Sequence, residues 1–477
     1  MGNSSGSLSD YWKVIKERRN KGLQGGFIWD WCDQGLEQID VGDDENNKLL
    51  WRSWHKYGGD YGDEPSDRNF NINGMISPSR NPHPAMHEFK KCVQPVDFLL
   101  NIDGQTKRVT LRVFNLYYFS TLDDLIGFWS IKIGGFVVKH GTFSFPEMLL
   151  PQTAGDVSMN DVTAFLSGDN RSDWVAAEIY LDISVAARKD YDGLVFHRPS
   201  DPVATEQFPI FNLISPSTTI EPAPRFLTNI LTSPCKHVVD VKEGPDFIHM
   251  SSNNFTVKFT RGVGGFEYVH NSGMATKRLV WDVYPNLFRA GTDNDGVKQL
   301  VIKGFNDESK PLGKWLRLGL DCVSLNDIVI DSGYQMFNGE EFPCITAKAT
   351  IVGFPGRNTY AGIKLAEKVS SSLQDHDQYK ELGTWQQRVT MHSSGSLFVE
   401  TKLDLRKDLV DLPRVGIQLS IPAIMSESVY FADGLFENYS DRRLAAHAGI
   451  YREHVAEYPQ QYIVPQEQGN RMNMRWL

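Results

Sequence analysis

Indole rings alternate with carboxylate and amide side chains in one short segment near the start of the chain. Residues 25–34 run Gly-Gly-Phe-Ile-Trp-Asp-Trp-Cys-Asp-Gln. An indole face can cover the apolar C–H face of a sugar ring, while carboxylates and amides bond its hydroxyl groups. These side chains therefore predict a sugar-binding site with Trp29 as a stacking platform. A tryptophan buried in the core is the alternative for Trp29.

A second polar segment, residues 57–70, is rich in glycine and aspartate, a composition that lets a loop approach a ligand closely. Asp30 and Asp60 could supply the two carboxyl groups, about 5–5.5 Å apart, that a retaining glycosidase uses. Aspartates in glycine-rich loops more often accept hydrogen bonds from loop amides, and we expect this structural role for both. The pair Asn73-Gly74 is by itself typical of a plain turn.

Two further clusters are predicted to be structural. His83 and His87 are four residues apart, but the prolines at 82 and 84 place His83 at or before a helix start, so we predict no zinc site. The acidic run at 40–45 lacks the regular oxygen-ligand spacing of a calcium loop. We predict a solvated loop there.

The elements that must position these residues can be predicted from their patterns. Apolar side chains recur at helical spacing in 8–15, and Ser7 is followed three residues later by an acidic residue, as in a capping box. Residues 25–32 are apolar and aromatic after a glycine pair, which predicts one buried strand. Prolines near the start of 82–92, followed by an apolar stripe, predict a second helix.

The next part of the chain, residues 96–213, has the pattern of a small antiparallel β-sandwich. Asp103-Gly104 and Gly134-Gly135 are hairpin turn signals between alternating apolar segments. Residues 178–185 alternate strictly between apolar and polar, which predicts a strand with one face in water.

The remainder is again β-rich. Residues 214–224 are rich in proline, serine and threonine, a composition typical of a linker. Apolar runs at 255–259, 343–353 and 415–421 predict further strands in the last part of the chain, residues 225–477.

Composition excludes several classes of protein. The chain has 477 residues, 41% of them hydrophobic and 23% charged, as in an ordinary globular protein. A net charge of −10 argues against general nucleic-acid binding, which needs a basic surface. No apolar run is long enough for a membrane span, and five scattered cysteines fit reduced thiols and a cytoplasmic setting.

The polar segments strongly resemble the large β-galactosidases of glycoside hydrolase family 2. Residues 25–34 match the family pattern Gly-Gly-Phe-(Ile/Val)-Trp-Asp-Trp-x-Asp-Gln. Residues 57–70 match Tyr-Gly-Gly-Asp-(Phe/Tyr)-Gly-Asp-x-Pro-x-Asp-Arg-x-Phe, and Asn73-Gly74 and His83-Pro84-Ala85 follow in the family order. Three later segments also resemble family motifs, namely 289–296, 437–442 and 462–471. The chain departs from the family pattern at Ala432, Leu435 and Gln468.

By this resemblance the fold is mainly β with an α/β N-terminal piece. Residues 1–95 would be the C-terminal remnant of a (β/α)8 catalytic barrel, and 96–213 an immunoglobulin-like β-sandwich. A linker at 214–224 would lead to 225–477, a truncated large antiparallel β-sandwich (supersandwich) similar to the β-galactosidase small chain.

The resemblance also assigns roles to individual residues. Trp29 and Asn73 would bind the substrate, and the Phe70 backbone carbonyl and the Asn73 side chain would form an incomplete sodium site. Both catalytic Glu residues of the family would lie upstream of Met1, so no residue of this chain is assigned as nucleophile or acid/base. A mobile loop over the active site would fall at Gly296, Val297 and Lys298.

The resemblance implies that the intact protein hydrolyses terminal non-reducing β-D-galactose residues with retention, using magnesium and sodium. It also implies a homotetramer in the intact enzyme, with a β-galactoside as partner and neither nucleic acid nor membrane. The chain alone is expected to be inactive. A non-catalytic carbohydrate-binding or assembly β-sandwich protein is the alternative function.

Overall fold

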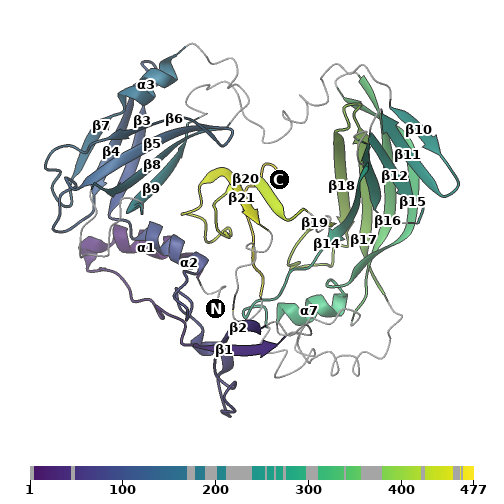
Figure 1. The fold of residues 1–477 in the computed structure, drawn as a ribbon, viewed down its shortest axis with the longest axis horizontal. Coiled ribbons are helices and arrows are strands. Elements are labelled where there is room, and N and C mark those ends of the chain that lie inside the picture. Colours follow the sequence, from purple (N-terminus) through teal and green to yellow (C-terminus); the bar gives the residue numbers. More distant parts are fainter. Residues whose placement is uncertain are drawn as a thin grey trace. The chain divides into compact units, whose positions relative to one another are not determined.

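The structure, a computed structural model, describes residues 5–43, 49–168, 178–188, 201–210, 239–252, 255–262, 265–271, 276–296, 310–337, 340–355, 379–420, 425–454, 462 and 466–477. Contacts group the chain into a first unit, residues 1–222 with 427–477, and a second unit, residues 223–426. Strands dominate both units (Figure 1), so the predicted mainly β fold is confirmed. The predicted linker at 214–224 lies outside the described residues.

Both predicted helices of the N-terminal piece are present as α1 (Leu8–Glu17) and α2 (Pro84–Cys92). Pro84 stands in the first turn of α2, where its missing N–H costs no helical hydrogen bond. The two helices meet where the rings of Trp12 and Phe89 pack edge to face at 5.7 Å. The predicted capping box of α1 is wrong, because Ser7 has a left-handed backbone and its side chain caps nothing.

The predicted buried strand at 25–32 is also wrong. Among the described residues this segment makes one isolated parallel bridge, between Cys32 and Ile76, and Phe27 is fully exposed. A strand is held by its neighbours, and a barrel strand has a partner on each side. No such neighbouring strands lie beside 25–31 in the described structure, so an apolar sequence alone does not bury this segment.

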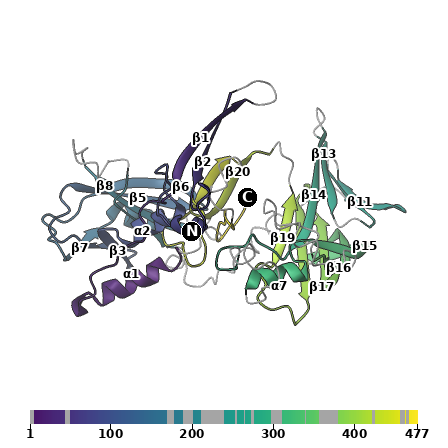
Figure 2. The same ribbon diagram turned by 90° about the horizontal axis from the view of Figure 1, so that it is seen from below.

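A hairpin that the sequence patterns did not predict follows. Strands β1 (Leu36–Asp43) and β2 (Leu49–Lys56) pair antiparallel from Leu36 with Lys56 to Asp43 with Leu49, and Figure 2 shows them as a long extended ribbon. The acidic run at 40–45, predicted as a loop, begins inside β1, and its last two residues lie outside the described part. The acidic composition of residues 40–45 therefore did not reveal that the run begins within a paired strand.

The predicted β-sandwich is present in the first unit as two antiparallel sheets. Both predicted hairpins form, because Asp103-Gly104 lies between β3 and β4 and Gly134-Gly135 joins β5 to β6. Their inner faces enclose one core, in which Leu111, Ile131 and Leu181 are fully buried. The first sheet consists of β3 (Val96–Ile102), β4 (Val109–Asn115) and β7 (Ala154–Ser158), and the second of β6 (Phe136–Phe143), β5 (Leu125–Ile133), β8 (Ile179–Ala187) and β9 (Ala204–Pro209). Helix α3 (Asn160–Ser167) follows β7.

The outer face of β8 is covered, contrary to the prediction of a wet face. Tyr180 on this face is buried against Phe431 of β20 (Glu427–Asp433) and Ala448 of β21 (Ala448–His454). The Gln207 side chain donates to the Ala448 carbonyl and accepts from its N–H. Residues 427–477, which we call the C-terminal segment, therefore pack with the first unit. The predicted domain limits stay predictions.

The second unit is built from two antiparallel sheets around their own core, which includes Phe259, Trp385 and Ile351. The strands predicted at 255–259, 343–353 and 415–421 are found as β12, β16 and β19. The larger sheet contains β10 (Asp240–Glu243), β11 (Phe247–Ser252), β12 (Phe255–Thr260), β13 (Phe266–Asn271), β14 (Thr276–Asn286) and β19 (Gly416–Ser420). The smaller sheet contains β15 (Val323–Phe337), β16 (Glu340–Gly353), β17 (Lys380–Met391) and β18 (Leu397–Leu405), and helix α7 (Pro311–Leu318) packs nearby.

None of the helices in the described residues is long and apolar enough to cross a membrane. Four cysteines of the described part, Cys32, Cys92, Cys322 and Cys344, are free thiols.

The exposed apolar side chains of the N-terminal piece lead to a prediction of self-association. Phe27, Trp29 and Trp31 are all exposed in a segment that belongs to no strand, and exposed apolar patches favour association. We expect the weight-average sedimentation coefficient to rise with protein concentration, and an apolar dye to bind. A compact monomer at every concentration, without dye binding, would contradict this expectation.

Candidate active site

The two polar segments of the sequence lie side by side through backbone hydrogen bonds. The Asp30 N–H donates to the Asn73 carbonyl at 3.1 Å, and the Gln34 N–H donates to the Asn71 carbonyl at 3.0 Å. The Met75 N–H donates back to the Asp30 carbonyl at 3.0 Å. Residues 29–34 and 71–76 therefore form one local structure, although the chain between them includes the whole β1–β2 hairpin.

Asp33 is the buried centre of this structure. One of its carboxylate oxygens accepts the Gly74 N–H at 2.7 Å, and the other accepts His83 Nε2 at 2.7 Å. Position 74 must be glycine, because a Cβ there would lie 2.1 Å from the Asp33 nitrogen. The carboxylate thus ties the turn at 73–74 to the start of α2, and His83 has a structural role, as predicted.

Three further aspartates, Asp30, Asp60 and Asp63, accept hydrogen bonds from loop groups, which is the structural role predicted for Asp30 and Asp60. Asp30 accepts hydrogen bonds from the Trp31 N–H at 2.8 Å and from the Gln34 side chain at 2.5 Å. Asp60 accepts the Tyr57 N–H at 3.0 Å. Asp63 accepts the Gly59 N–H at 2.9 Å, a bond that lowers the pKa of Asp63 by stabilising its charged form.

The predicted substrate-binding residues differ in their surroundings. Trp29 is 79% exposed, so the alternative of a core tryptophan is excluded. Asn73 presents a buried side-chain oxygen, Oδ1, that accepts no hydrogen bond from the described residues. Such an unsatisfied acceptor costs free energy unless a ligand supplies the missing partner. Phe70 lies in the short helix η3 (Arg68–Asn71), three residues before Asn73.

The predicted lid residues fall mostly outside the described part of the chain. Gly296 ends a turn with a left-handed φ of 106°, and Val297 and Lys298 are not described. The preceding Asp295 holds this turn by accepting hydrogen bonds from the Arg289 side chain at 2.6 Å and the Thr292 N–H at 2.8 Å. The role of a lid stays a prediction.

A contact network that the sequence patterns did not predict supports the site from the C-terminal segment. The rings of His83 and Tyr462 stack at 6.0 Å, and the Tyr462 hydroxyl donates to the Glu437 carboxylate. Burial, and next the Glu437 charge, raise the pKa of Tyr462, so that its phenol keeps the proton it donates. Glu437 also accepts the Gly469 N–H at 2.8 Å and pairs with Arg442 at 2.6 Å.

Both members of this ion pair are almost fully buried, with side chains 2% exposed at Glu437 and 6% at Arg442. The network therefore runs from a buried ion pair through Tyr462 and His83 to Asp33 and the turn that carries Asn73. The motif matches at 437–442 and 462–471 were the only sequence indication of it, and they did not reveal which residues touch.

No group of three or more His, Cys, Asp or Glu side chains in the described residues is arranged to hold a metal ion. The site thus offers an exposed indole and an unsatisfied amide oxygen, whereas the carboxylates of Asp30, Asp33, Asp60 and Asp63 already accept hydrogen bonds.

Comparisons with known proteins cover most of the chain. Residues 1–98 match the family model of the glycosyl hydrolases family 2 TIM barrel domain. Residues 111–210 match the model of β-galactosidase domain 4, and residues 251–477 match that of the β-galactosidase small chain.

Curated relatives are similar over the whole chain. A β-galactosidase of Pseudoalteromonas haloplanktis is 28% identical over 487 residues, one of Psychromonas ingrahamii is 29% identical over 491, and one of Leuconostoc mesenteroides is 26% identical over 480. Each alignment covers 100% of this chain and 40% of the relative, so the chain spans about two fifths of the length of these proteins.

Proposed function

Because the chain belongs to glycosyl hydrolase family 2, among the β-galactosidases, we propose that it forms the C-terminal part of a retaining β-galactosidase. The substrate class would be β-galactosides with a terminal non-reducing β-D-galactose residue. The observation that carries the proposal is local. An exposed indole at Trp29 stands on the same hydrogen-bonded structure as the unsatisfied amide oxygen of Asn73.

In this proposal the chain binds and orients the sugar. The Trp29 indole covers the apolar face of galactose, and Asn73 Oδ1 accepts a hydrogen bond from a sugar hydroxyl. The retaining reaction itself needs an acid/base and a nucleophile about 5–5.5 Å apart, with a covalent glycosyl intermediate. We assign neither role to this chain, because Asp30, Asp33 and Asp60 are bound to backbone and side-chain donors.

Two oxygens of this site would hold a sodium ion. The unsatisfied Asn73 Oδ1 and the Phe70 carbonyl, three residues earlier, are hard ligands of the kind such a cation prefers. Bound there, sodium would supply a positive charge beside the sugar hydroxyls. The described residues offer no carboxylate cluster that would hold magnesium.

We also propose that the whole protein assembles as a homo-oligomer and resides in the cytoplasm. The four free thiols of the described residues support a reducing compartment. The family similarity supports assembly, for which the exposed apolar side chains of the first unit offer contact area.

A chimera tests the proposal. The upstream part of the P. haloplanktis relative, which this chain does not match, would be joined in front of Met1. We expect the chimera to hydrolyse nitrophenyl β-galactoside. In the chimera, Trp29→Ala and Asn73→Ala should each reduce kcat/KM roughly tenfold to a hundredfold, since one stacking face or one buried hydroxyl contact contributes about 1–3 kcal/mol.

Matched controls come from the sandwich. Phe136→Ala removes an exposed ring from β6 and Asn101→Ala an exposed amide from β3, and neither should change the kinetics. Unchanged kinetics in the Trp29 and Asn73 variants of an active chimera would remove both residues from the site.

A further inference from the structure

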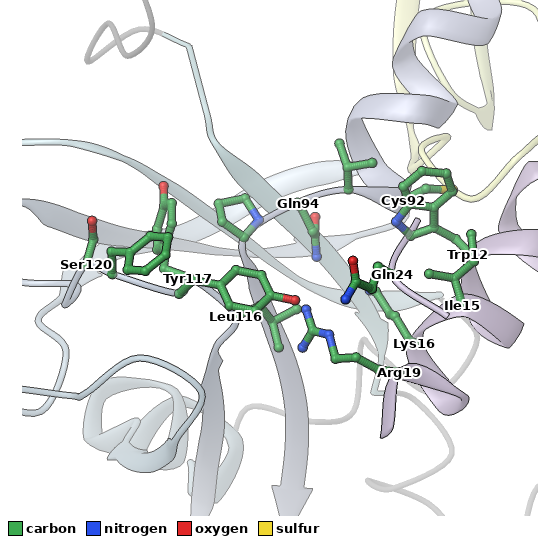
Figure 3. A pocket seen from close by; sticks show the side chains of 14 residues that line it. Trp12, Ile15, Lys16, Arg19, Gln24, Cys92, Gln94, Leu116, Tyr117 and Ser120 are labelled. Atoms are coloured by element: carbon green, nitrogen blue, oxygen red, sulfur yellow. The ribbon is translucent and has the colours of Figure 1, made fainter. Parts of the chain in front are cut away.

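A cavity of the first unit is lined by none of the residues 29–34 and 71–76 that carry Trp29 and Asn73. It has a volume of about 330 Å³ and opens between α1, the end of α2 and the loop at 116–120 of the sandwich (Figure 3). Trp12 and Ile15 of α1 form one side, and Tyr117, Tyr118 and Phe119 line it from the loop. Its volume is at the low end of small-molecule sites, enough for a monosaccharide.

The aromatic loop of this cavity is rigidly held. The buried Asn115 side chain donates to the Ser120 carbonyl at 2.9 Å and accepts the Tyr117 N–H at 3.0 Å. The Gln152 side chain donates to the carbonyls of Leu116 at 2.7 Å and Tyr117 at 2.9 Å. These four hydrogen bonds fix a loop on which Phe119 is 97% exposed and Tyr118 56%. A preorganised loop that displays aromatic rings to solvent is typical of a binding surface.

Arg19 supplies an available positive charge at the cavity. Its guanidinium lies 4.7 Å from the centre of the Tyr118 ring, and Nη1 donates to the Gln152 side chain at 2.8 Å. No carboxylate of the described residues pairs with it, whereas the neighbouring Lys16 is paired with Asp97 at 3.0 Å. No Asp or Glu is among the residues that line the cavity, although the chain has a net charge of −10.

We propose that this cavity binds an acidic sugar, a uronic acid or a saccharide that ends in one. The carboxylate would pair with the Arg19 guanidinium, whose planar fork matches it, and the sugar ring would lie against Tyr118 and Phe119. The Gln24 amide, beside Arg19 in Figure 3, is placed to bond ring hydroxyls. Positive charge, aromatic rings and amides without carboxylates favour this class over a neutral sugar, which needs no cation.

The test compares two sugars that differ at one carbon. Galacturonate carries a carboxylate where galactose carries a hydroxymethyl group, so their affinities for the intact chain isolate the contribution of charge. Saturation-transfer NMR and titration calorimetry at low salt should show galacturonate binding about tenfold more tightly, as expected for one charge-assisted contact. High salt should reduce that preference.

Variants locate the site. Arg19→Gln should abolish the preference for galacturonate, and Phe119→Ala should weaken binding of both sugars. Lys16→Gln should have a smaller effect than Arg19→Gln, because Lys16 is already paired. Asn73→Ala should leave galacturonate binding unchanged, which separates this site from the proposed galactose site.

Four results would overturn the proposal: no binding at millimolar galacturonate, equal affinity for the two sugars, an unchanged preference in Arg19→Gln, or loss of galacturonate binding in Asn73→Ala. A change in self-association in Arg19→Gln without sugar would also overturn it, in favour of a second copy of the chain as occupant. None of these measurements depends on hydrolysis, so they stand apart from the test of the proposed function.

Discussion

Purified by itself, the chain is expected to hydrolyse no β-galactoside at a measurable rate. Glycoside hydrolysis needs one carboxyl group to protonate the leaving group and a second to attack, and general acid catalysis alone contributes about 10²–10⁴-fold. In the described site Asp30 and Asp60 accept hydrogen bonds from loop amides. Asp33 is buried between Gly74 and His83. These three carboxyl groups are therefore already engaged in holding the local structure.

The measurement uses a nitrophenyl β-galactoside with magnesium and sodium present. The matched variant is Asp30→Asn/Asp60→Asn, which removes the pair that sequence alone could suggest as catalytic. Turnover by the unmodified chain that this double variant abolishes would show that the nucleophile has been misassigned. Galactose binding without turnover would instead favour the alternative of a non-catalytic carbohydrate-binding protein for the chain alone.

Replacing Glu437 with alanine is expected to destabilise the first unit by about 3–5 kcal/mol. The substitution would leave the Arg442 guanidinium buried without its partner, which is the costly way to break a buried ion pair. It would also remove the acceptor of the Tyr462 hydroxyl and of the Gly469 N–H. The stacking of Tyr462 on His83 should then be lost.

Urea unfolding measures the loss of stability in Glu437→Ala. Two independent probes are needed, because the two units need not unfold together. Glu427→Ala is the control, since its pair with Arg452 is exposed to solvent and should contribute little to stability. The double variant Glu437→Leu/Arg442→Met should recover much of the loss by replacing both charges with apolar side chains. If Glu437→Ala lowered the free energy of unfolding no more than Glu427→Ala does, the buried ion pair would not have the stabilising role assigned to it.

The sequence predicted the sandwich well because its determinants are local. Glycine turns set the two hairpins, and alternation placed Leu111, Ile131 and Leu181 in the core. Helices α1 and α2 were likewise predicted from apolar spacing and from Pro84. The polar site segments were found because indoles, carboxylates and amides are uncommon neighbours, and the structure brings them together.

The errors occurred where structure depends on distant partners. Residues 25–32 have the composition of a strand, yet a strand exists only through hydrogen bonds to neighbours, and the described structure provides one bridge. Tyr180 follows an alternating pattern but is buried by β20 and β21, which lie far along the chain. The link from Glu437 through Tyr462 to His83 joins residues several hundred positions apart, so no local pattern could reveal it.

The sequence order of the two units bears on how the chain folds as it is synthesised. Residues 223–426, the second unit, are contiguous, so that unit can fold as soon as its own sequence has left the ribosome. The first unit is divided in the sequence, because residues 427–477 bury Tyr180 and donate a hydrogen bond to Glu88. The earlier part of the chain must therefore complete its packing last, and until then its unfinished surfaces are open to chaperones and to other chains.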